Sequence, residues 1–282
     1  MLYEISSGDI SVKISDSGAE IKSVTYRGEE RAWQNDNGTW ARTSPILFPV
    51  CGNTSVKIDG EDYNIPFHGF ARDIVFTLED RKSDEITFVL KSNEQTFAVY
   101  PFEFELRVNY KVISDSIIIT NEIKNVGKSP MPFAIGRHDS FTLKKPIGNY
   151  KLCFPCDEEF LSQKTNEKGQ LINLYVDFGK GKEFELPEDY LTEGQTVIFG
   201  GINSDSVTLK TLDDQPIAEV LFDEIRNLLI WRPNEAQMIC IEPWSALPDK
   251  FDEEGEEFLN KTRLSVIEPG KTESIVFKIR YS

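Results

Sequence analysis

The chain contains only two histidines in 282 residues, and both lie in similar surroundings. His68 stands between a phenylalanine and a glycine in the segment PFHGFARD, and His138 lies in AIGRHDSF. Because glycine has no Cβ, the backbone or a ligand can come close to the neighbouring imidazole. Imidazole titrates near neutral pH and can give up or take a proton there. The two histidines are therefore the first candidates for acid–base chemistry.

A candidate partner carboxylate lies in the apolar segment MICIEPW, residues 238–244. In a β-strand Met238, Cys240 and Glu242 would share one face, and the strand is apolar enough to be buried on both faces. Pro243 has no N–H to donate, so we expect strand pairing to end there. A carboxylate in such surroundings has a raised pKa, which suits a general base near neutral pH. The alternative is a structural glutamate that pairs with an arginine or caps a turn.

The surroundings of His138 also predict a site. Strand alternation puts Ala134, Gly136 and His138 on one face, where the two small residues leave a hollow beside the imidazole. Arg137 would then point to the opposite face unless a bulge intervenes. The alternative is a core histidine with satisfied hydrogen bonds. Two histidines and a glutamate, all at apolar and aromatic strand ends, favour a binding or catalytic pocket.

Alternating strands must position these residues, because helical patterns are scarce. Val, Ile, Phe, Thr and Tyr fill the predicted strands. The predicted strands are residues 10–14, 21–26, 56–60, 63–65, 74–79, 85–92, 102–114, 116–126, 150–154, 206–211, 218–222, 228–231, 238–242 and 274–281. One short helix is expected within 249–261, and polar loops at 165–170 and 179–182. Many short strands without helices indicate an all-β antiparallel sandwich or barrel.

Length and charge narrow the choice further. A chain of 282 residues can build one large all-β domain or two smaller ones, and no linker divides it, so we expect a single domain over 1–282. The net charge of −16 disfavours nucleic acid and anionic membranes as partners. Neither a signal peptide nor a membrane-spanning stretch is visible, which predicts a cytoplasmic protein.

Four cysteines raise the question of redox or metal chemistry. Cys153 and Cys156 form a C-x-x-C pair, but a zinc site would need a second ligand pair and a thioredoxin-like motif would need to open a helix. The surrounding KLCFPCDEEF has the pattern of strand and loop. We therefore expect buried, reduced, structural thiols and no bound metal.

An ordered set of motifs over nearly the whole length resembles the aldose 1-epimerase (galactose mutarotase-like) family, in its lactose-operon X-protein-like branch. The motifs are GAEI (18–21), Trp33, Trp40, SPILFP (44–49), HGFAR (68–72), YPFEF (100–104), NVG (125–127), PFAIG (132–136) with His138, CIEPW (240–244) and EPG (268–270). The resemblance implies a large twisted antiparallel β-sandwich and a cofactor-independent isomerase that acts on a small-molecule sugar.

The resemblance also implies roles for the candidate residues. Glu242 would be the general base that takes the anomeric proton of an aldohexose, and His138 the acid that protonates the ring oxygen. His68 would hold and polarise the sugar oxygens. Only protons move in such a reaction, so no cofactor or metal is expected. A monomer or a homodimer is compatible with this interpretation.

One position departs from the family pattern. Family members carry Gly-Arg after the LFP segment, whereas this chain has Gly52-Asn53. Asn53 can hydrogen-bond a hydroxyl but lacks the guanidinium fork, and Arg72 is a candidate replacement. Two alternatives to a mutarotase therefore stay open: a non-catalytic sugar-binding or sensing module, and a hexose-6-phosphate 1-epimerase. The latter would need basic residues that converge on the pocket.

Overall fold

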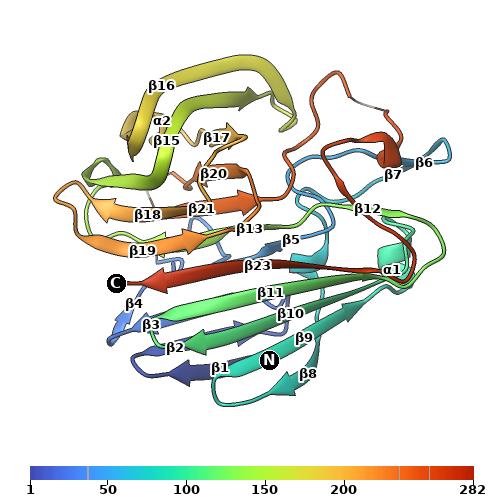
Figure 1. Ribbon diagram of the computed structural model, residues 1–282, viewed down its shortest axis with the longest axis horizontal. Helices are drawn as coiled ribbons and strands as arrows, with labels where there is room; N and C mark the ends of the chain where they lie inside the picture. Colours follow the sequence, from blue (N-terminus) through green and yellow to red (C-terminus); the bar gives the residue numbers. More distant parts are fainter. Residues whose placement is uncertain (37, 235, 254) are drawn as a thin grey trace.

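Two large antiparallel sheets form most of the computed structural model, which describes residues 1–36, 38–234, 236–253 and 255–282 (Figure 1). The larger sheet has nine strands, in the spatial order β16 (Leu171–Glu185), β15 (Tyr150–Thr165), β18 (Ser206–Thr211), β19 (Pro216–Leu221), β23 (Thr272–Tyr281), β11 (Ser116–Asn125), β10 (Phe104–Ile113), β9 (Glu85–Lys91) and β8 (Thr77–Arg81). The predicted all-β antiparallel sandwich is thereby confirmed.

The second sheet carries the residues that the sequence singles out. Its order is β17 (Val197–Gly200), β20 (Asn227–Trp231), β21 (Met238–Trp244), β13 (Gly136–Arg137) and β5 (Ile46–Leu47), and β14 (Asp139–Thr142) also pairs with β21. His138 lies between β13 and β14, and Glu242 lies on β21. Two segments about 100 residues apart in the sequence thus become neighbours through strand pairing.

Smaller sheets extend the two large ones. The chain begins with a four-stranded meander of β1 (Leu2–Ser7), β2 (Ile10–Ser15), β3 (Ile21–Tyr26) and β4 (Glu29–Glu30). Two strand pairs follow it, β6 (Val56–Ile58) with β7 (Glu61–Tyr63), and β12 (Met131–Phe133) with β22 (Ser265–Ile267). The strands predicted at 56–60 and 63–65 correspond to the β6–β7 pair.

Helices are short and few in the described part of the chain. They are α1 (Glu94–Phe97), α2 (Glu188–Thr192) and the 3-10 turns η1 (Ala71–Asp73), η2 (Ile147–Asn149) and η3 (Phe258–Asn260). The helix expected within 249–261 is wrong for the described residues of that range, which form a β-bridge at Lys250, turns and η3. No helix among the described residues has the length and apolarity that crossing a membrane requires.

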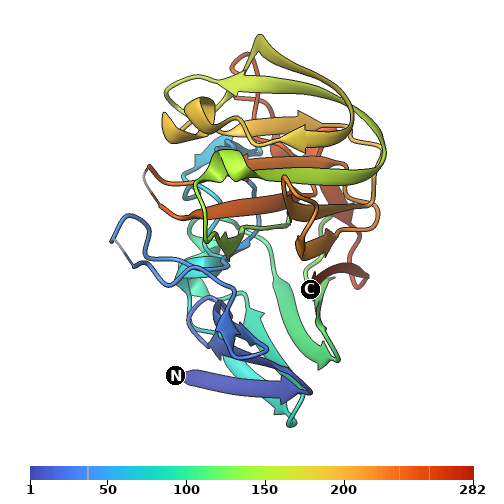
Figure 2. The ribbon, with the colours of Figure 1, turned by 90° about the vertical axis from the view of Figure 1, so that its left-hand side faces the viewer.

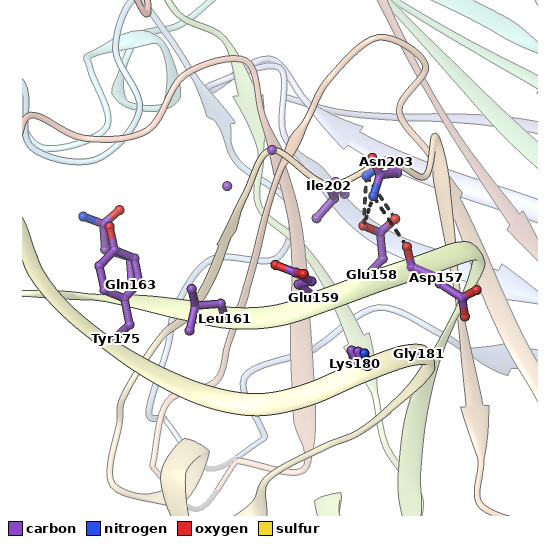
Figure 3. Close-up of a pocket in the computed structure, with 12 residues that line it drawn as sticks. Asp157, Glu158, Glu159, Leu161, Gln163, Tyr175, Lys180, Gly181, Ile202 and Asn203 are labelled. Carbon is purple, nitrogen blue, oxygen red and sulfur yellow. Dashed lines mark hydrogen bonds between the residues drawn. The ribbon is translucent and has the colours of Figure 1, made fainter.

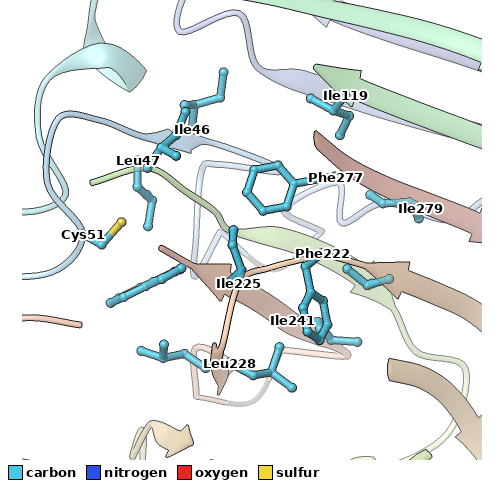
Figure 4. Packing of buried hydrophobic residues seen from close by; sticks show 14 of the residues in the cluster. Ile46, Leu47, Cys51, Ile119, Phe222, Ile225, Leu228, Ile241, Phe277 and Ile279 are labelled. Carbon is cyan, nitrogen blue, oxygen red and sulfur yellow. The ribbon is translucent and has the colours of Figure 1, made fainter. Parts of the chain in front are cut away.

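The main core fills the space between the two large sheets (Figure 4). Ile119 and Phe277 come from the nine-stranded sheet, and Leu47, Leu228 and Ile241 come from the six-stranded sheet. All five side chains are buried. Because one apolar cluster joins strands from both ends of the chain, we propose that residues 1–282 form one domain.

The β10–β11 hairpin shows how sequence pattern becomes structure. Buried and half-buried residues alternate along β10, as expected for a strand with one face on the core. Ser114 adopts a φ of +57° in the tight turn between the strands, and every residue from Phe104 to Ile113 pairs with its counterpart on β11. The strands predicted at 102–114 and 116–126 are confirmed here.

The β15–β16 hairpin differs most from expectation. Only Tyr150–Cys153 of β15 pair with β18, so beyond Cys153 the hairpin leaves the sheet and curves over one end of the molecule (Figure 2). The predicted loop at 179–182 is wrong, because these residues lie inside β16. Cys156 is exposed rather than buried, since its part of β15 no longer has a sheet beneath it, and Cys153 is half-buried. The free thiols of both residues agree with the prediction.

Candidate active site

A cavity of about 410 Å³ opens on the face of the six-stranded sheet that carries Glu242. His68, His138 and Arg72 line it together with Glu242. The remaining lining residues are Trp40, Gly52, Phe67, Thr165, Gly169, Thr196, Ile198, Leu229, Trp231, Trp244 and Pro248. This volume lies in the range of small-molecule pockets. The fold therefore brings together four of the five residues that the sequence predicts for the site.

Glu242 is held rigidly because β21 is paired along both of its edges. Leu229 of β20 is its register partner on one side, and β13 and β14 pair with β21 on the other. Pairing continues through Pro243 to Trp244, so the prediction that Pro243 ends it is wrong. Pro243 faces Leu228 near the end of the pairing with β20, where the ladder tolerates a missing donor.

The electrostatic surroundings of Glu242 favour its protonated form. Its side chain is 2% exposed. Burial raises the pKa of this carboxyl well above its ordinary value, and the negative charge of Asp139 adds to the shift, while Trp244 opposes it. The predicted direction of the pKa shift and its predicted cause agree with this environment.

His138 lies beside this carboxyl. Its backbone N–H donates to the carbonyl of Pro45, which fixes the chain between β13 and β14. The imidazole Nε2 lies 3.2 Å from Oε2 of Glu242. Burial lowers the pKa of His138 to about 3, and the positive charges of Arg72 and Arg42 add to the shift. The pair thus consists of a carboxyl that resists losing its proton and an imidazole that resists gaining one.

Aromatic side chains hold the His138 ring. Trp40 lies 4.9 Å away between ring centroids at an interplanar angle of 31°, and Trp231 packs edge-on at 5.5 Å. Nδ1 of His138 is buried and has no hydrogen-bond partner among the described residues. The orientation of this ring is therefore set by packing and by its backbone rather than by a hydrogen bond at Nδ1.

His68 is fixed in one tautomer. Its Nδ1 accepts a hydrogen bond of 3.0 Å from the backbone N–H of Gly52, so Nε2 carries the proton in the neutral ring. Burial lowers the pKa of His68 well below its ordinary value, and the charges of His138, Arg72 and Arg42 add to the shift. His68 is therefore a neutral N–H donor in the cavity wall, with its ring centroid 5.8 Å from that of His138.

Arg72 and Asn53 differ in their relation to the cavity. Arg72 lies within η1 and reaches the cavity wall, where its Nη2 donates to the carbonyl of Phe67 at 2.6 Å. Its Nε is buried and has no hydrogen-bond partner among the described residues. Asn53 is not a lining residue, and its amide donates to the carbonyl of Lys168 at 2.6 Å. Arg137 is fully buried and pairs with Asp139 at 2.7 Å, on the opposite side, as alternation predicts.

The tryptophans of the wall are site residues that the sequence reasoning missed. Trp244 lies two positions after Glu242, so strand alternation alone could have placed it on the same face. Trp231 pairs with Cys240 of the neighbouring strand, and that register is not visible in the sequence. A cavity does lie beside the His138 imidazole, as predicted, but Gly136 does not open it. A Cβ at Gly136 would lie 2.8 Å from Cδ1 of Trp244, so the indole fills the space next to this glycine.

Three side chains in the site are of kinds that bind metal ions in proteins. The ligand atoms of His138, Cys240 and Glu242 lie within 4.8 Å of one another. Metal binding requires a deprotonated thiol. Burial raises the pKa of the Cys240 thiol well above its ordinary value, and the charges of Glu242 and Asp139 add to the shift. A metal at this cluster would therefore have to displace the proton of a buried thiol.

The comparisons with known proteins agree with the antiparallel β-sandwich described above. The sequence model of the family described as "Aldose 1-epimerase" matches residues 1–265, and the chain belongs to this family. It is 30% identical to the chromosomal protein LacX of Lactococcus lactis subsp. lactis, over 95% of both chains.

Solved structures show the same fold. A galactose mutarotase related enzyme from Lactobacillus acidophilus superimposes with a TM-score of 0.91 at 29% identity, covering 100% of this chain and 97% of that one. A galactose mutarotase-like protein from Lactobacillus casei ATCC 334 gives a TM-score of 0.90 at 25% identity, covering 100% of both chains.

Proposed function

We propose that this protein is a mutarotase that interconverts the α and β anomers of an aldohexose. The observation that carries the proposal is the 3.2 Å contact between Nε2 of His138 and Oε2 of Glu242 in a sugar-sized cavity. Ring opening needs a base at the anomeric hydroxyl and an acid at the ring oxygen. This pair supplies two proton-transferring groups within reach of one C–O unit.

The opposite pKa shifts make the pair a single proton-holding unit. Between the lowered pKa of His138 and the raised pKa of Glu242, the two groups together hold one proton. Moving that proton across the contact gives a carboxylate and an imidazolium. Glu242 then takes the anomeric proton while His138 protonates the ring oxygen. After the aldehyde turns about its C1–C2 bond, the reverse transfers close the ring as the other anomer.

His68 and Arg72 would bind the sugar. His68 offers its Nε2–H, because Gly52 occupies Nδ1. Arg72 offers the part of its guanidinium that the Phe67 carbonyl does not engage. The indoles of Trp231 and Trp244 provide apolar surface for the C–H face of a pyranose. The reaction moves only protons, so these side chains suffice for it.

A non-catalytic sugar-binding module is the first alternative. Such a module needs the cavity but not the His138–Glu242 pair. The absence of an arginine at position 53 favours it. The presence of Arg72 in the cavity wall weakens that argument, since a guanidinium reaches the site by another route.

A hexose-6-phosphate 1-epimerase is the second alternative, and one observation favours it. Arg42 donates to the carbonyl of Arg72 at 3.2 Å, so two guanidinium groups lie near the two histidines. However, Arg42 also pairs with Asp73 at 2.5 Å and does not line the cavity. Comparing glucose with glucose 6-phosphate as substrates separates this alternative from the proposal.

The proposal is tested by polarimetry of freshly dissolved α-D-galactose, α-D-glucose and their 6-phosphates. We expect the wild type to accelerate mutarotation and Glu242→Gln to lose roughly 10²–10⁴-fold in kcat, because glutamine cannot accept the anomeric proton. Sugar binding, measured by calorimetry, should survive in Glu242→Gln. Activity retained within a few-fold in this variant would reduce Glu242 to a structural role. A wild type that binds but does not catalyse would establish the binding module.

A further inference from the structure

A second and larger cavity, of about 850 Å³, lies where the β15–β16 hairpin passes the end of β17 (Figure 3). Residues of both hairpin strands form one wall, and the segment 200–203 forms the other. In Figure 3 the side chains of Gln163 and Tyr175 stand next to each other, and Leu161 and Glu159 follow along the same strand as Gln163. None of these residues takes part in the site described above.

The wall has the chemistry of a surface that binds neutral polyols. Tyr175 is 51% exposed and Leu161 is 43% exposed, which gives apolar area for the C–H face of a sugar ring. Asp157, Glu159 and the amide oxygen of Gln163 offer acceptors beside this area, while the amide nitrogen of Gln163 donates to the carbonyl of Ile172 at 3.0 Å. Two carboxylates against one lysine, Lys180, disfavour an anionic ligand.

Glu158 is not counted among the groups open to a ligand, because it has a structural role. Its buried carboxylate accepts hydrogen bonds from the backbone N–H groups of Asn203 and Ser204, and from the hydroxyl of Ser204. These bonds fasten the segment 200–203 to β15 and so shape the second cavity. The groups left for a ligand are the side chains of Asp157, Glu159, Tyr175 and Lys180 and the amide oxygen of Gln163.

Strands β15 and β17 each contribute residues to both cavities: the one that holds His138 and Glu242, called the catalytic cavity here, and the second one. On β15, Thr165 lines the catalytic cavity and Gln163 lines the second. On β17, Ile198 lines the catalytic cavity and Gly200 lines the second. On β17 the step covers two residues on one face of the strand, or about 6.7 Å. On β15 the register with β16 shifts between Gln163 and Thr165. Ile198 donates its N–H to the hydroxyl of Ser162 at 2.9 Å, which holds β17 against β15 along this path.

We propose that the second cavity is a subsite for the further units of an oligosaccharide whose reducing-end unit occupies the catalytic cavity. Only the reducing-end unit has a free anomeric hydroxyl, so only this unit can be opened by His138 and Glu242. The remaining units must leave the catalytic cavity, and the path along Thr165 and Gln163 ends at the Tyr175 surface. This inference rests on the proposed function.

The test compares Tyr175→Ala with Leu174→Ala as a matched control. Leu174 is the preceding residue of β16, is 60% exposed and lines neither cavity. Mutarotation is measured for galactose and glucose, and for lactose, maltose and maltotriose. We expect Tyr175→Ala to lower kcat/KM about tenfold for the oligosaccharides and less than twofold for the hexoses, and Leu174→Ala to change neither.

Binding of maltotriose to Glu242→Gln and to Glu242→Gln/Tyr175→Ala, measured by calorimetry, separates the subsite from the catalysis. An affinity for maltotriose that depends on Tyr175 supports the subsite, even if the wild type opens no sugar ring. A wild type that opens no sugar ring would overturn the proposed function alone. The opposite result is a wild type that opens hexoses and a Tyr175→Ala variant that affects hexoses and oligosaccharides equally, or affects neither. That result would overturn the subsite and leave the proposed function intact.

Discussion

At the residue scale, Arg72 is better placed than Asn53 to contact a sugar in the cavity. Asn53 engages its amide with the Lys168 carbonyl and lies outside the cavity lining. Arg72 lines the cavity, and its Nε has no hydrogen-bond partner among the described residues, although it lies 3.8 Å from a carboxylate oxygen of Asp73. A guanidinium that reaches the cavity from η1 could offer the charge and planar donors that the family resemblance leads us to expect at position 53. The loss of arginine at position 53 is therefore compatible with catalysis.

This placement gives a prediction for two variants. Arg72→Gln should raise KM for a hexose roughly 10- to 150-fold, because a charge-assisted hydrogen bond contributes about 1.5–3 kcal/mol. Asn53→Ala should leave KM within twofold, as its side chain makes no cavity contact. Steady-state polarimetry with both variants checks this. The assignment reverses if Asn53→Ala raises KM and Arg72→Gln does not.

At the element scale, the turn that carries His68 depends on one glycine. Gly69 has a φ of +74°, and a Cβ there would lie 2.1 Å from the carbonyl oxygen of Phe48. The residues Phe48 and Gly69 form a β-bridge, so the backbone approaches itself directly beside the imidazole. Only glycine permits this approach, and the approach sets the position of His68 in the cavity wall.

Gly69→Ala should therefore destabilise the protein more than a glycine replacement that meets no neighbour. Gly60 is the matched control, since its φ is +81° and a Cβ at this position would have no other atom within 4 Å. In both variants an alanine must adopt a left-handed backbone conformation, which costs about 1–2 kcal/mol. Gly69→Ala should add about 1–3 kcal/mol for the overlap with Phe48 and lower kcat as well. Urea unfolding of both variants gives the difference, and equal losses would contradict the close approach.

The arrangement of the strands explains which parts of the site could be predicted from the sequence and which could not. Rare residue types in ordered motifs identify His68, His138 and Glu242, and strand alternation gives the faces of β21 correctly. Partners across strands depend on register, which is why the sequence does not reveal Trp231 or the second cavity. Loop composition at 179–182 suggests a turn, but pairing with β15 outweighs the weak β propensity of glycine and lysine.

At the scale of the whole molecule, the sandwich buries groups that would ionise in the unfolded chain. Burial holds Glu242 in its protonated form above the ordinary carboxyl pKa of 4.5. The folded state therefore binds one more proton than the unfolded state at every pH between 4.5 and the raised pKa. Stability from this group is fully present below 4.5 and is lost as the pH rises toward the raised pKa. The active site thus lowers the stability of the fold at neutral pH.

Replacing Glu242 by glutamine should remove this dependence. The free energy of unfolding of Glu242→Gln, relative to the wild type, should rise with pH above 4.5 by at most about 1.4 kcal/mol per pH unit. Urea unfolding of both proteins from pH 4.5 to 8.5 measures the difference. Glu122→Gln, at an exposed position of β11, removes a carboxylate far from this environment and should track the wild type. Parallel curves for Glu242→Gln and the wild type would mean that the folded protein ionises Glu242 as readily as the unfolded chain, and the one-proton pair with His138 would lose its basis.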